Sequence, residues 1–312
     1  MKVSVIGGGG RVGSNTLFAL QCSGIIKELV AIDVAAPDLA SGEALDLRHG
    51  AALAGAQKIW AGDYSAAANS DVVVITAGLR RKPDESRLEL INRNVSMFRT
   101  ILKEARAGGA FSPNTVLVVV SNPVDILTYI AVEEAGLPAQ QVIGTGTMLD
   151  TTRFRSLLAE HFHVAAPDVQ ALILGEHGDS MVPILSTASI NGTPMKSFPG
   201  YEEGGVRAIF EMTKKAGAEV IRMKGGAGWA IALATRAVVE AILLDTDRVL
   251  PVSSLQDGLW GLKNLCISVP TRVRRSGVVE RIPIHISAEE QQEIVTSAEV
   301  LSKTLADVQS AC

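Results

Sequence analysis

Short apolar runs alternate with amphipathic stretches through the first half of the chain. The runs are three to five residues long, rich in Val and Ile, and almost uninterrupted by polar side chains. Strands that helices cover on both faces have this character. We therefore expect buried strands at Val3–Ile6, Leu29–Ile32, Val72–Thr76, Val116–Val120 and Val142–Gly144.

The stretches between these runs have the spacing of helices. The clearest has apolar side chains three to four positions apart, at Leu88, Ile91, Val95, Phe98 and Leu102. Strands that alternate with helices are joined by right-handed crossovers and form a parallel sheet. The pattern predicts an α/β fold with a doubly wound parallel sheet, the Rossmann arrangement.

The second half of the chain has a different pattern. Asn191-Gly192 and Ser276-Gly277 separate strand-like runs, which predicts two hairpins. Long helical patterns follow, at about Tyr201–Lys224 and Trp229–Asp245 and from about Ala288. We therefore expect two domains in direct contact, residues 1–145 and an α+β domain of residues 146–312.

Composition limits the classes of function. The 312 residues are 47% apolar, enough for two cores, and the net charge of −4 gives no reason to expect nucleic acid or a membrane surface as a partner. The three cysteines form no CxxC, and no His/Cys/Asp/Glu cluster has the spacing of metal ligands. Met1–Ile6 leads directly into a strand, so we expect no signal peptide. Taken together, these features predict a cytoplasmic protein with no membrane span and no metal.

A glycine loop follows the first predicted strand. Gly7, Gly8, Gly10 and Gly13 stand in a run that satisfies GxGxxG and then opens a helix. Glycines in this place allow a tight turn and a close approach of the backbone to a pyrophosphate, which the helix N-terminus then holds. These four glycines are the first candidates for a dinucleotide site, although a flexible turn would also be rich in glycine.

Asp33 supports the dinucleotide interpretation. It ends the second predicted strand about twenty residues after the loop, where an acid can hold the ribose hydroxyls. A carboxylate there repels a 2′-phosphate, and Val34-Ala35-Ala36 offers no arginine to receive one. The sequence therefore predicts NAD rather than NADP as cofactor, with a loop cap as the alternative role for Asp33.

One histidine lies in a turn suited to acid/base chemistry. His177 stands between Gly175-Glu176 and Gly178-Asp179-Ser180, directly after the strand-like run Val169–Leu174. Imidazole titrates nearest neutrality, and a glycine-rich turn leaves it accessible. The remaining histidines have no comparable setting and are expected to be solvated: His49, His161, His163 and His285.

The chain resembles the lactate/malate dehydrogenase family over essentially its whole length. The resemblance rests on four motifs in the family's order: Thr76-Ala77-Gly78, Ser121-Asn122-Pro123-Val124-Asp125, Leu149-Asp150-Thr151-Thr152-Arg153-Phe154-Arg155 and Leu174-Gly175-Glu176-His177-Gly178-Asp179-Ser180. It implies an NAD-dependent 2-hydroxyacid dehydrogenase that assembles as a dimer or tetramer and acts on a small 2-hydroxy or 2-oxo acid.

The resemblance also assigns roles to individual residues. His177 takes or returns the hydroxyl proton, and Asp150 fixes its tautomer, although the position of Asp150 also suits a helix N-cap. Arg153 grips the substrate carboxylate, for which a planar guanidinium is well shaped. Asn122 belongs to the substrate and cofactor side of the site, although Ser-Asn-Pro is also an ordinary turn. Asn94 is expected to contact the cofactor.

Arg87 is marked by local chemistry as well. Ser86 and Glu89 form a capping box, which puts Arg87 in the first turn of a helix, where a cation opposes the dipole at a cost of roughly 0.3–1 kcal/mol. A residue that is locally unfavourable invites a functional explanation. The resemblance supplies one, since this arginine enters with a closing loop and polarises the reacting carbonyl.

The loop before Arg87 gives an expectation for the substrate. By the resemblance, the residue before Lys-Pro faces the substrate's C3 substituent; lactate enzymes have glutamine there, malate enzymes have arginine, and this chain has Arg81. Ala227, where lactate enzymes commonly have threonine, points the same way. We therefore expect malate dehydrogenase activity. Asp84 departs from the malate pattern and, with Glu85, could neutralise Arg81, which leaves lactate or another 2-hydroxy acid as the alternative.

Two other classes of protein are not expected, and neither is one kind of regulation. A non-catalytic nucleotide-binding protein would keep the glycines and lose the acid/base pair, yet His177 and Asp150 are both present. An interaction module would show a charge run or a repeat, and the chain has neither. Arg155 matches one half of a sugar-bisphosphate activator site, but Gln170 stands where its histidine would be, so we expect no such activation.

Overall fold

The computed structural model describes residues 1–79 and 84–310. Within these ranges the strands form a nine-stranded sheet, in the order β12-β11-β10-β6-β5-β4-β1-β2-β3, and a three-stranded sheet, β7-β8-β9. The strands are β1 Lys2–Ile6, β2 Glu28–Ile32, β3 Lys58–Gly62, β4 Val72–Ile75, β5 Val116–Val119, β6 Val142–Gly144, β7 Val169–Leu174, β8 Val182–Ile190, β9 Thr193–Pro194, β10 Arg248–Asp257, β11 Lys263–Arg274 and β12 Gly277–Arg281.

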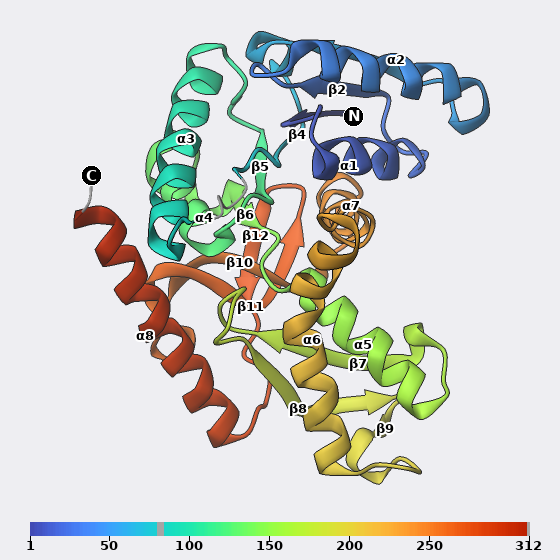
Figure 1. The fold of residues 1–312 in the computed structure, drawn as a ribbon, viewed down its shortest axis with the longest axis vertical. Helices are drawn as coiled ribbons and strands as arrows, with labels where there is room; N and C mark the ends of the chain where they lie inside the picture. The colour runs from blue at the N-terminus through green and yellow to red at the C-terminus, as the bar shows by residue number, and fades with distance from the viewer. Residues whose placement is uncertain (80–83, 311–312) are drawn as a thin grey trace.

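Long helices cover these sheets (Figure 1). They are α1 Arg11–Gln21, α2 Pro37–Ala54, α3 Arg87–Ala107, α4 Val124–Glu134, α5 Met148–Phe162, α6 Glu203–Lys224, α7 Trp229–Leu243 and α8 Ala288–Ser310. The helices expected from the periodicity of the sequence lie within two residues of the observed bounds at their clearest ends, and α8 begins at Ala288 as predicted.

Strands β1 to β6 are parallel to one another and confirm the predicted doubly wound sheet. Their order, β6-β5-β4-β1-β2-β3, reverses direction at β1, as in dinucleotide-binding folds. All five strands predicted from apolar runs are present. The sequence did not predict β3, because its side chains at the sheet edge are mostly half-exposed and do not form an apolar run.

The two faces of this sheet pack against different helices. In β4, Val73 and Ile75 contact the cluster that contains α3, α4 and α8 residues, whereas Val72 and Val74 contact the cluster that contains α1, α2 and α7 residues. Successive side chains of a strand point to opposite faces, so four consecutive valine and isoleucine residues supply both cores. Burial on both faces fixes the position of the strand and of the loop that follows it.

The second half of the chain extends the first sheet. Strand β10 pairs antiparallel with β6, where Ser253 lies opposite Gly144, and the hairpin β10-β11-β12 continues the sheet beyond it. The hairpin predicted at Asn191-Gly192 joins β8 to β9 with both residues at positive φ, as its turn type requires. The division at residues 145 and 146 stays a prediction, and a continuous sheet crosses it.

The motif residues follow the carboxyl ends of the parallel strands. The glycine loop follows β1, Thr76 follows β4, and Asn122 lies three residues beyond β5. Because parallel strands end at the same edge of a sheet, these segments gather there. Thr76 joins two of them directly, since its Oγ1 donates to the carbonyl of Gly7 over 3.3 Å.

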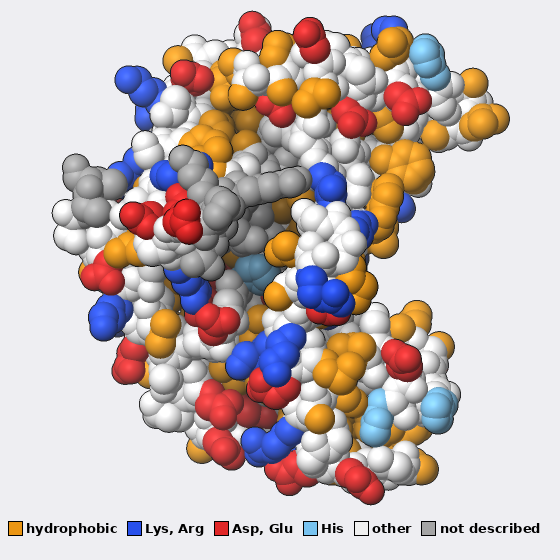
Figure 2. Space-filling view, in the orientation of Figure 1, with side chains coloured by type: hydrophobic (Ala, Val, Ile, Leu, Met, Phe, Trp, Pro, Cys, Tyr) orange, Lys and Arg blue, Asp and Glu red, His pale blue; other side chains and the backbone are white. Residues whose placement is uncertain are grey.

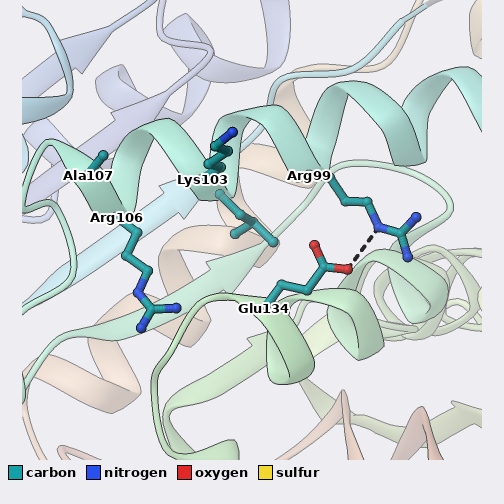
Figure 3. Close-up of a pocket in the computed structure, with 6 residues that line it drawn as sticks. Arg99, Lys103, Arg106, Ala107 and Glu134 are labelled. Carbon is teal, nitrogen blue, oxygen red and sulfur yellow. Dashed lines mark hydrogen bonds and ion pairs between the residues drawn. The ribbon is translucent and has the colours of Figure 1, made fainter.

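A concave region lies away from this edge, where α3 meets α4 (Figure 3). It has a volume of about 440 Å³ and is lined by Arg99, Lys103, Arg106 and Glu134 among others. Arg99 Nε donates to Glu134 Oε1 over 2.8 Å.

Within the described part of the chain, no helix is long and apolar enough to cross a membrane.

Candidate active site

The predicted histidine turn joins β7 to β8. Gly175 directly follows β7 at a φ of 87°, a conformation that favours glycine, and pairs with Ser268 of β11 through hydrogen bonds of 3.0 and 3.2 Å. His177 follows two residues later, and its side chain is 21% exposed. The sheet therefore fixes the beginning of the turn and leaves the imidazole at a cavity.

Asp150 of α5 lies against the imidazole of His177. Its Oδ2 is 2.5 Å from Nδ1 of His177, and its side chain is 1% exposed. Burial lowers the pKa of His177, but the charge of Asp150 and its hydrogen bond, with a smaller contribution from Asp125, raise that pKa above its ordinary value. Conversely, burial raises the pKa of Asp150, and the charges of His177 and Arg153 lower it by more.

These contacts exclude the alternative role of Asp150. The N-cap of α5 is Thr147, so Asp150 lies inside the first turn and caps nothing. Its second oxygen, Oδ1, accepts a hydrogen bond of 3.1 Å from Nη1 of Arg153. The buried carboxylate of Asp150 thus contacts both His177, its predicted catalytic partner, and Arg153, which is predicted to bind the substrate.

Arg153 and Arg155 have different surroundings. The side chain of Arg153 is 17% exposed and lies beside the histidine pair. Nη2 of Arg155 donates to the carbonyl of Pro167 over 3.4 Å, and Gln170 donates to the same carbonyl over 3.2 Å. Burial lowers the pKa of Arg155, with the positive charge of Arg248 acting in the same direction. The expected absence of sugar-bisphosphate activation stays a prediction.

Asp125 is a residue of this site for which its motif predicted no role. Its Oδ2 accepts the backbone N–H of His177 over 2.8 Å, which ties α4 to the histidine turn. Burial raises the pKa of the Asp125 carboxyl to about 6, although the hydrogen bond from His177 acts in the opposite direction. A charged residue within the apolar segment Val124–Ile130 was the available signal.

Arg87 lies at the start of α3, opposite the histidine turn. The predicted capping box is confirmed, since Ser86 Oγ accepts the N–H of Glu89 and Glu89 accepts the N–H of Ser86. Nη1 of Arg87 is 2.7 Å from Oδ2 of Asp179, and its Nη2 is 3.6 Å from Oε1 of Glu176. Both carboxylates belong to the histidine turn, so that turn and the start of α3 face each other.

A cavity of about 260 Å³ separates α3, α4 and the histidine turn. Figure 2 shows a hollow at the centre of this face of the molecule, with a histidine side chain at its base. His177, Arg87, Asn94 and Asn122 line the cavity, so four of the predicted site residues meet there. Asp150 and Arg153 are not among its lining residues; Asp150 contacts the imidazole of His177, and Arg153 contacts Asp150.

The two asparagines differ in how far the protein engages them. Asn94 is 3% exposed; its Oδ1 accepts the N–H of Leu79 over 2.8 Å and its amide donates to the carbonyl of Leu90 over 3.0 Å. Both ends of Asn94 thus bind backbone, and its expected cofactor contact stays a prediction. Oδ1 of Asn122 accepts a 3.3 Å hydrogen bond from the N–H of Val124, and Asn122 lines the cavity.

The glycine loop has the form that a pyrophosphate site needs. A Cβ on Gly13 would lie 2.0 Å from the carbonyl oxygen of Gly7, and one on Gly7 would lie 2.6 Å from the amide nitrogen of Ala77. Gly10 caps α1 without any side-chain hydrogen bond, and the first turn carries no acidic residue. The N-terminal amides of α1 are therefore left for an anion, and the residues fit the pyrophosphate of NAD.

Asp33 forms the loop cap, and its contact with the ribose stays a prediction. Its Oδ1 accepts the N–H of Ala36 over 3.1 Å, which is the loop cap. Its Oδ2 lies toward the glycine loop, 3.2 Å from the position that a Cβ on Gly9 would take. One oxygen thus holds the carboxylate in place while the other faces the loop, where a ribose hydroxyl would bind.

Arg81 lies outside the described residues. Of the two acids that follow it, Glu85 is 8% exposed and its Oε1 pairs with Nη1 of Arg93 at 2.5 Å. Glu85, which was expected to help Asp84 neutralise Arg81, thus has an ion-pair partner on α3 that the sequence did not predict.

Known proteins resemble this chain along its whole length. The L-lactate dehydrogenase 1 of Clostridium acetobutylicum is 43% identical over 309 residues, which cover 97% of each chain. The crystal structure of the minor L-lactate dehydrogenase of Enterococcus mundtii has a TM-score of 0.93 at 38% identity and covers 98% of both chains. A malate dehydrogenase from Salinibacter ruber has a TM-score of 0.90 at 36% identity, covering 99% of this chain and 98% of its own.

The expectation of malate dehydrogenase activity is wrong. Curated relatives at 42 to 43% identity are named L-lactate dehydrogenases, and two solved structures with a TM-score of 0.93 are described as lactate dehydrogenases. The expectation rested mainly on the charge of Arg81, with weaker support from Ala227. A loop charge selects a substrate only where no neighbouring acid balances it, and Asp84 stands three residues after Arg81.

Two family descriptions match consecutive parts of the chain. The NAD binding domain of lactate/malate dehydrogenases matches residues 1–144, and their alpha/beta C-terminal domain matches residues 147–311. The cofactor is therefore NAD, as the glycine loop and Asp33 predicted. With the fold and the grouped site residues already established, the chain belongs to the lactate/malate dehydrogenase family and is an NAD-dependent oxidoreductase.

Proposed function

We propose that this protein is an L-lactate dehydrogenase, which interconverts L-lactate and pyruvate with NAD as the hydride carrier. The proposal is supported by the names of relatives that cover nearly the whole chain. It also agrees with the alternative that Asp84 left open in the sequence.

The observation that carries the proposal is the buried contact between His177 and Asp150. A carboxylate only accepts hydrogen bonds, so Nδ1 of His177 carries a proton toward Oδ2 of Asp150. This leaves Nε2 as the nitrogen that exchanges a proton with substrate. In pyruvate reduction Nε2 donates its proton to the carbonyl oxygen, and in lactate oxidation it accepts the hydroxyl proton.

Two arginines bind the substrate anion in this proposal. Arg153 forms paired hydrogen bonds with the carboxylate of pyruvate or lactate, oriented by its contact with Asp150. Arg87 directs its charge at the carbonyl oxygen, where negative charge develops during reduction. Asn122, on the same cavity wall, donates its amide to the same oxygen.

The glycine loop and Asp33 hold the cofactor. Backbone amides in the first turn of α1 bind the pyrophosphate, and Asp33 binds the ribose hydroxyls. NAD supplies the chemistry that the side chains lack, since its nicotinamide ring accepts or releases the hydride. The side chains of the site bind, orient and protonate the substrate.

The test is a panel of 2-oxo acids assayed with NADH and with NADPH. We expect pyruvate to have the highest kcat/KM and NADH to be preferred over NADPH. A kcat/KM for oxaloacetate above that for pyruvate would contradict the proposal, as would an absence of NADH oxidation with either acid.

The proposal includes two domains, at residues 1–145 and 146–312, which limited proteolysis tests. It also includes assembly into a dimer or tetramer, which sedimentation tests.

A further inference from the structure

The C-terminal helix α8 reaches the histidine turn through one buried hydroxyl. Oγ of Ser297 accepts the backbone N–H of Glu176 over 2.9 Å, and Ser297 is 1% exposed. It also lies 3.0 Å from Oγ of Ser180. A residue 120 positions later in the chain thus contacts both sides of His177.

The proton positions in this cluster follow from what each group can donate. Oγ of Ser180 is 2.5 Å from Oε2 of Glu176, and a carboxylate only accepts, so the single hydroxyl proton of Ser180 points to Glu176. The contact between the two serines must then be donated by Ser297. Its lone pairs remain free to accept the N–H of Glu176.

The result is a closed chain of hydrogen bonds that begins and ends on Glu176. It runs from the N–H of Glu176 to Ser297, from Ser297 to Ser180, and from Ser180 to the carboxylate of Glu176. Hydrogen bonds in such a chain polarise one another, and buried networks of this kind fix side-chain geometry. The chain holds Oε2 of Glu176, which leaves Oε1 for another partner.

That partner is Arg87. Oε1 of Glu176 is 3.6 Å from Nη2 of Arg87, and Glu176 lines the cavity that His177 and Arg87 also line. Asp179 competes for the same guanidinium at 2.7 Å, but its side chain is 89% exposed whereas that of Glu176 is 11% exposed. Arg87 itself is 63% exposed, so its contact with the exposed Asp179 contributes little. Of the two carboxylates, that of Glu176 is the one whose position the chain of hydrogen bonds fixes.

We propose that Ser297 is a positioning residue that, through Ser180, fixes the Glu176 carboxylate as the counter-ion that keeps Arg87 at the cavity. The inference rests on the proposed function, since it assumes that Arg87 acts on the substrate carbonyl. Without the hydroxyl of Ser297, the Glu176 carboxylate can turn away from Arg87, and the arginine spends more of its time at the exposed Asp179.

The test compares pyruvate reduction by wild-type protein, Ser297→Ala and Ser180→Ala, which break consecutive links of the chain. We expect kcat to fall about tenfold in each, the effect of one lost buried hydrogen bond, with an unchanged NADH half-saturation. Ser302→Ala is the matched control, because Ser302 lies on the same helix and bonds only to the carbonyl of Ala298 among the described residues. We expect it to keep the wild-type kcat.

A double-mutant cycle separates positioning from general damage. Glu176→Gln removes the charge that the hydroxyls orient, so adding Ser297→Ala to it should lower kcat by less than about twofold further. Losses that multiply as independent effects would overturn the proposal, as would a Ser297→Ala protein with wild-type kcat. If wild-type protein reduces no pyruvate, the proposed function fails instead, and the two failures are therefore distinguishable.

Discussion

Asp150 and His177 lie on different elements, α5 and the turn between β7 and β8, and their carboxylate and imidazole are 2.5 Å apart. The contact is almost fully buried on the side of Asp150 and partly open on the side of His177. Its net effect is to raise the pKa of the imidazole and to lower the pKa of the carboxyl. The pair therefore stabilises the protonated imidazole that pyruvate reduction requires.

Replacement of Asp150 by Asn tests this pairing. We expect Asp150→Asn to lower kcat/KM for pyruvate reduction by about a hundredfold or more, the range of a lost acid catalyst. Because the pKa of His177 falls without the carboxylate, the loss of reduction activity at high pH should move to lower pH. Rates measured across pH 5 to 9 give both quantities. Asp168→Asn, at an exposed acid before β7, is the control, and an unchanged pH profile in Asp150→Asn would contradict the assignment.

Replacement of Arg153 by Lys tests the carboxylate site. Lysine keeps the charge but cannot form two parallel hydrogen bonds, so we expect the KM for pyruvate to rise by about a hundredfold, or roughly 3 kcal/mol. The NADH dissociation constant, measured by fluorescence titration, should not change. Arg155→Lys, two residues away and directed at Pro167, should leave both constants within about twofold of wild type, given a surface hydrogen bond of this length.

The sequence predicted those parts of the fold that local chemistry determines. The capping box of Ser86 and Glu89 is a contact between residues three apart, and it was identified correctly. The strands of the parallel sheet were found because burial on both faces requires continuous apolar runs. Strand β3 was not found, because Lys58 and its neighbours at the sheet edge are partly exposed.

Contacts between distant segments were less accessible from the sequence. Nothing near Gly144 or Ser253 indicates that they pair, yet this pair joins the second half of the chain to the first sheet. Asp125 and Ser297 contact the histidine turn through backbone amides, and a backbone amide carries no sequence signal. The candidate catalytic residues were found because their side chains, and the family's motifs, are visible in the sequence.

The substrate was predicted wrongly for a related reason. The inference used the charge of Arg81, and the effect of one charge depends on what surrounds it. Glu85 has a partner on α3 in Arg93, which the linear sequence does not reveal. Fold and cofactor depend on many residues, so a single departure does not change them, whereas substrate choice depends on a few.

The buried carboxyl of Asp125 predicts a specific dependence of stability on pH. Its pKa is raised by burial to about 6 in the folded protein, from an ordinary value of 3.8. A folded state that binds the proton more tightly loses stability as pH rises between these values. Relative to wild type, Asp125→Asn should therefore gain stability between pH 4 and pH 7, by about 3 kcal/mol for a shift of two units.

Urea unfolding of both proteins at pH 4 and pH 7 measures this difference, since all other titrating groups are shared. Equal pH dependence in the two proteins would mean that the carboxyl does not titrate in this range. Activity should fall in Asp125→Asn at every pH, because an amide accepts the N–H of His177 more weakly than a carboxylate.

Cofactor selection is expected to depend on Asp33. Asp33→Ser keeps a hydrogen-bond acceptor for Ala36 and removes the charge beside the glycine loop. Repulsion of the 2′-phosphate then falls, and we expect the ratio of kcat/KM with NADPH to that with NADH to rise about tenfold or more, the effect of at least 1.4 kcal/mol. Asp38→Ser in the first turn of α2 should leave the ratio unchanged.

Two glycines of the first domain should respond in opposite ways to a single methyl group. A Cβ on Gly13 would lie 2.0 Å from the Gly7 carbonyl, so Gly13→Ala must move the loop away from α1. We expect NADH binding to weaken at least about a hundredfold and the Tm to fall, because the turn and the helix N-terminus no longer form one surface for the pyrophosphate. Isothermal titration with NADH and thermal melts measure the two effects.

Gly42 supplies the matched control, since it lies inside α2 and a Cβ there meets no atom within 4 Å. Alanine in an open helical position lowers the entropy of the unfolded chain and favours the helix by about 0.5–1 kcal/mol. Gly42→Ala should therefore bind NADH as wild type does and melt at a slightly higher temperature. If Gly13→Ala also kept wild-type affinity, the close contact between Gly13 and Gly7 would have no part in cofactor binding, and the pyrophosphate site would have to lie elsewhere at the sheet edge.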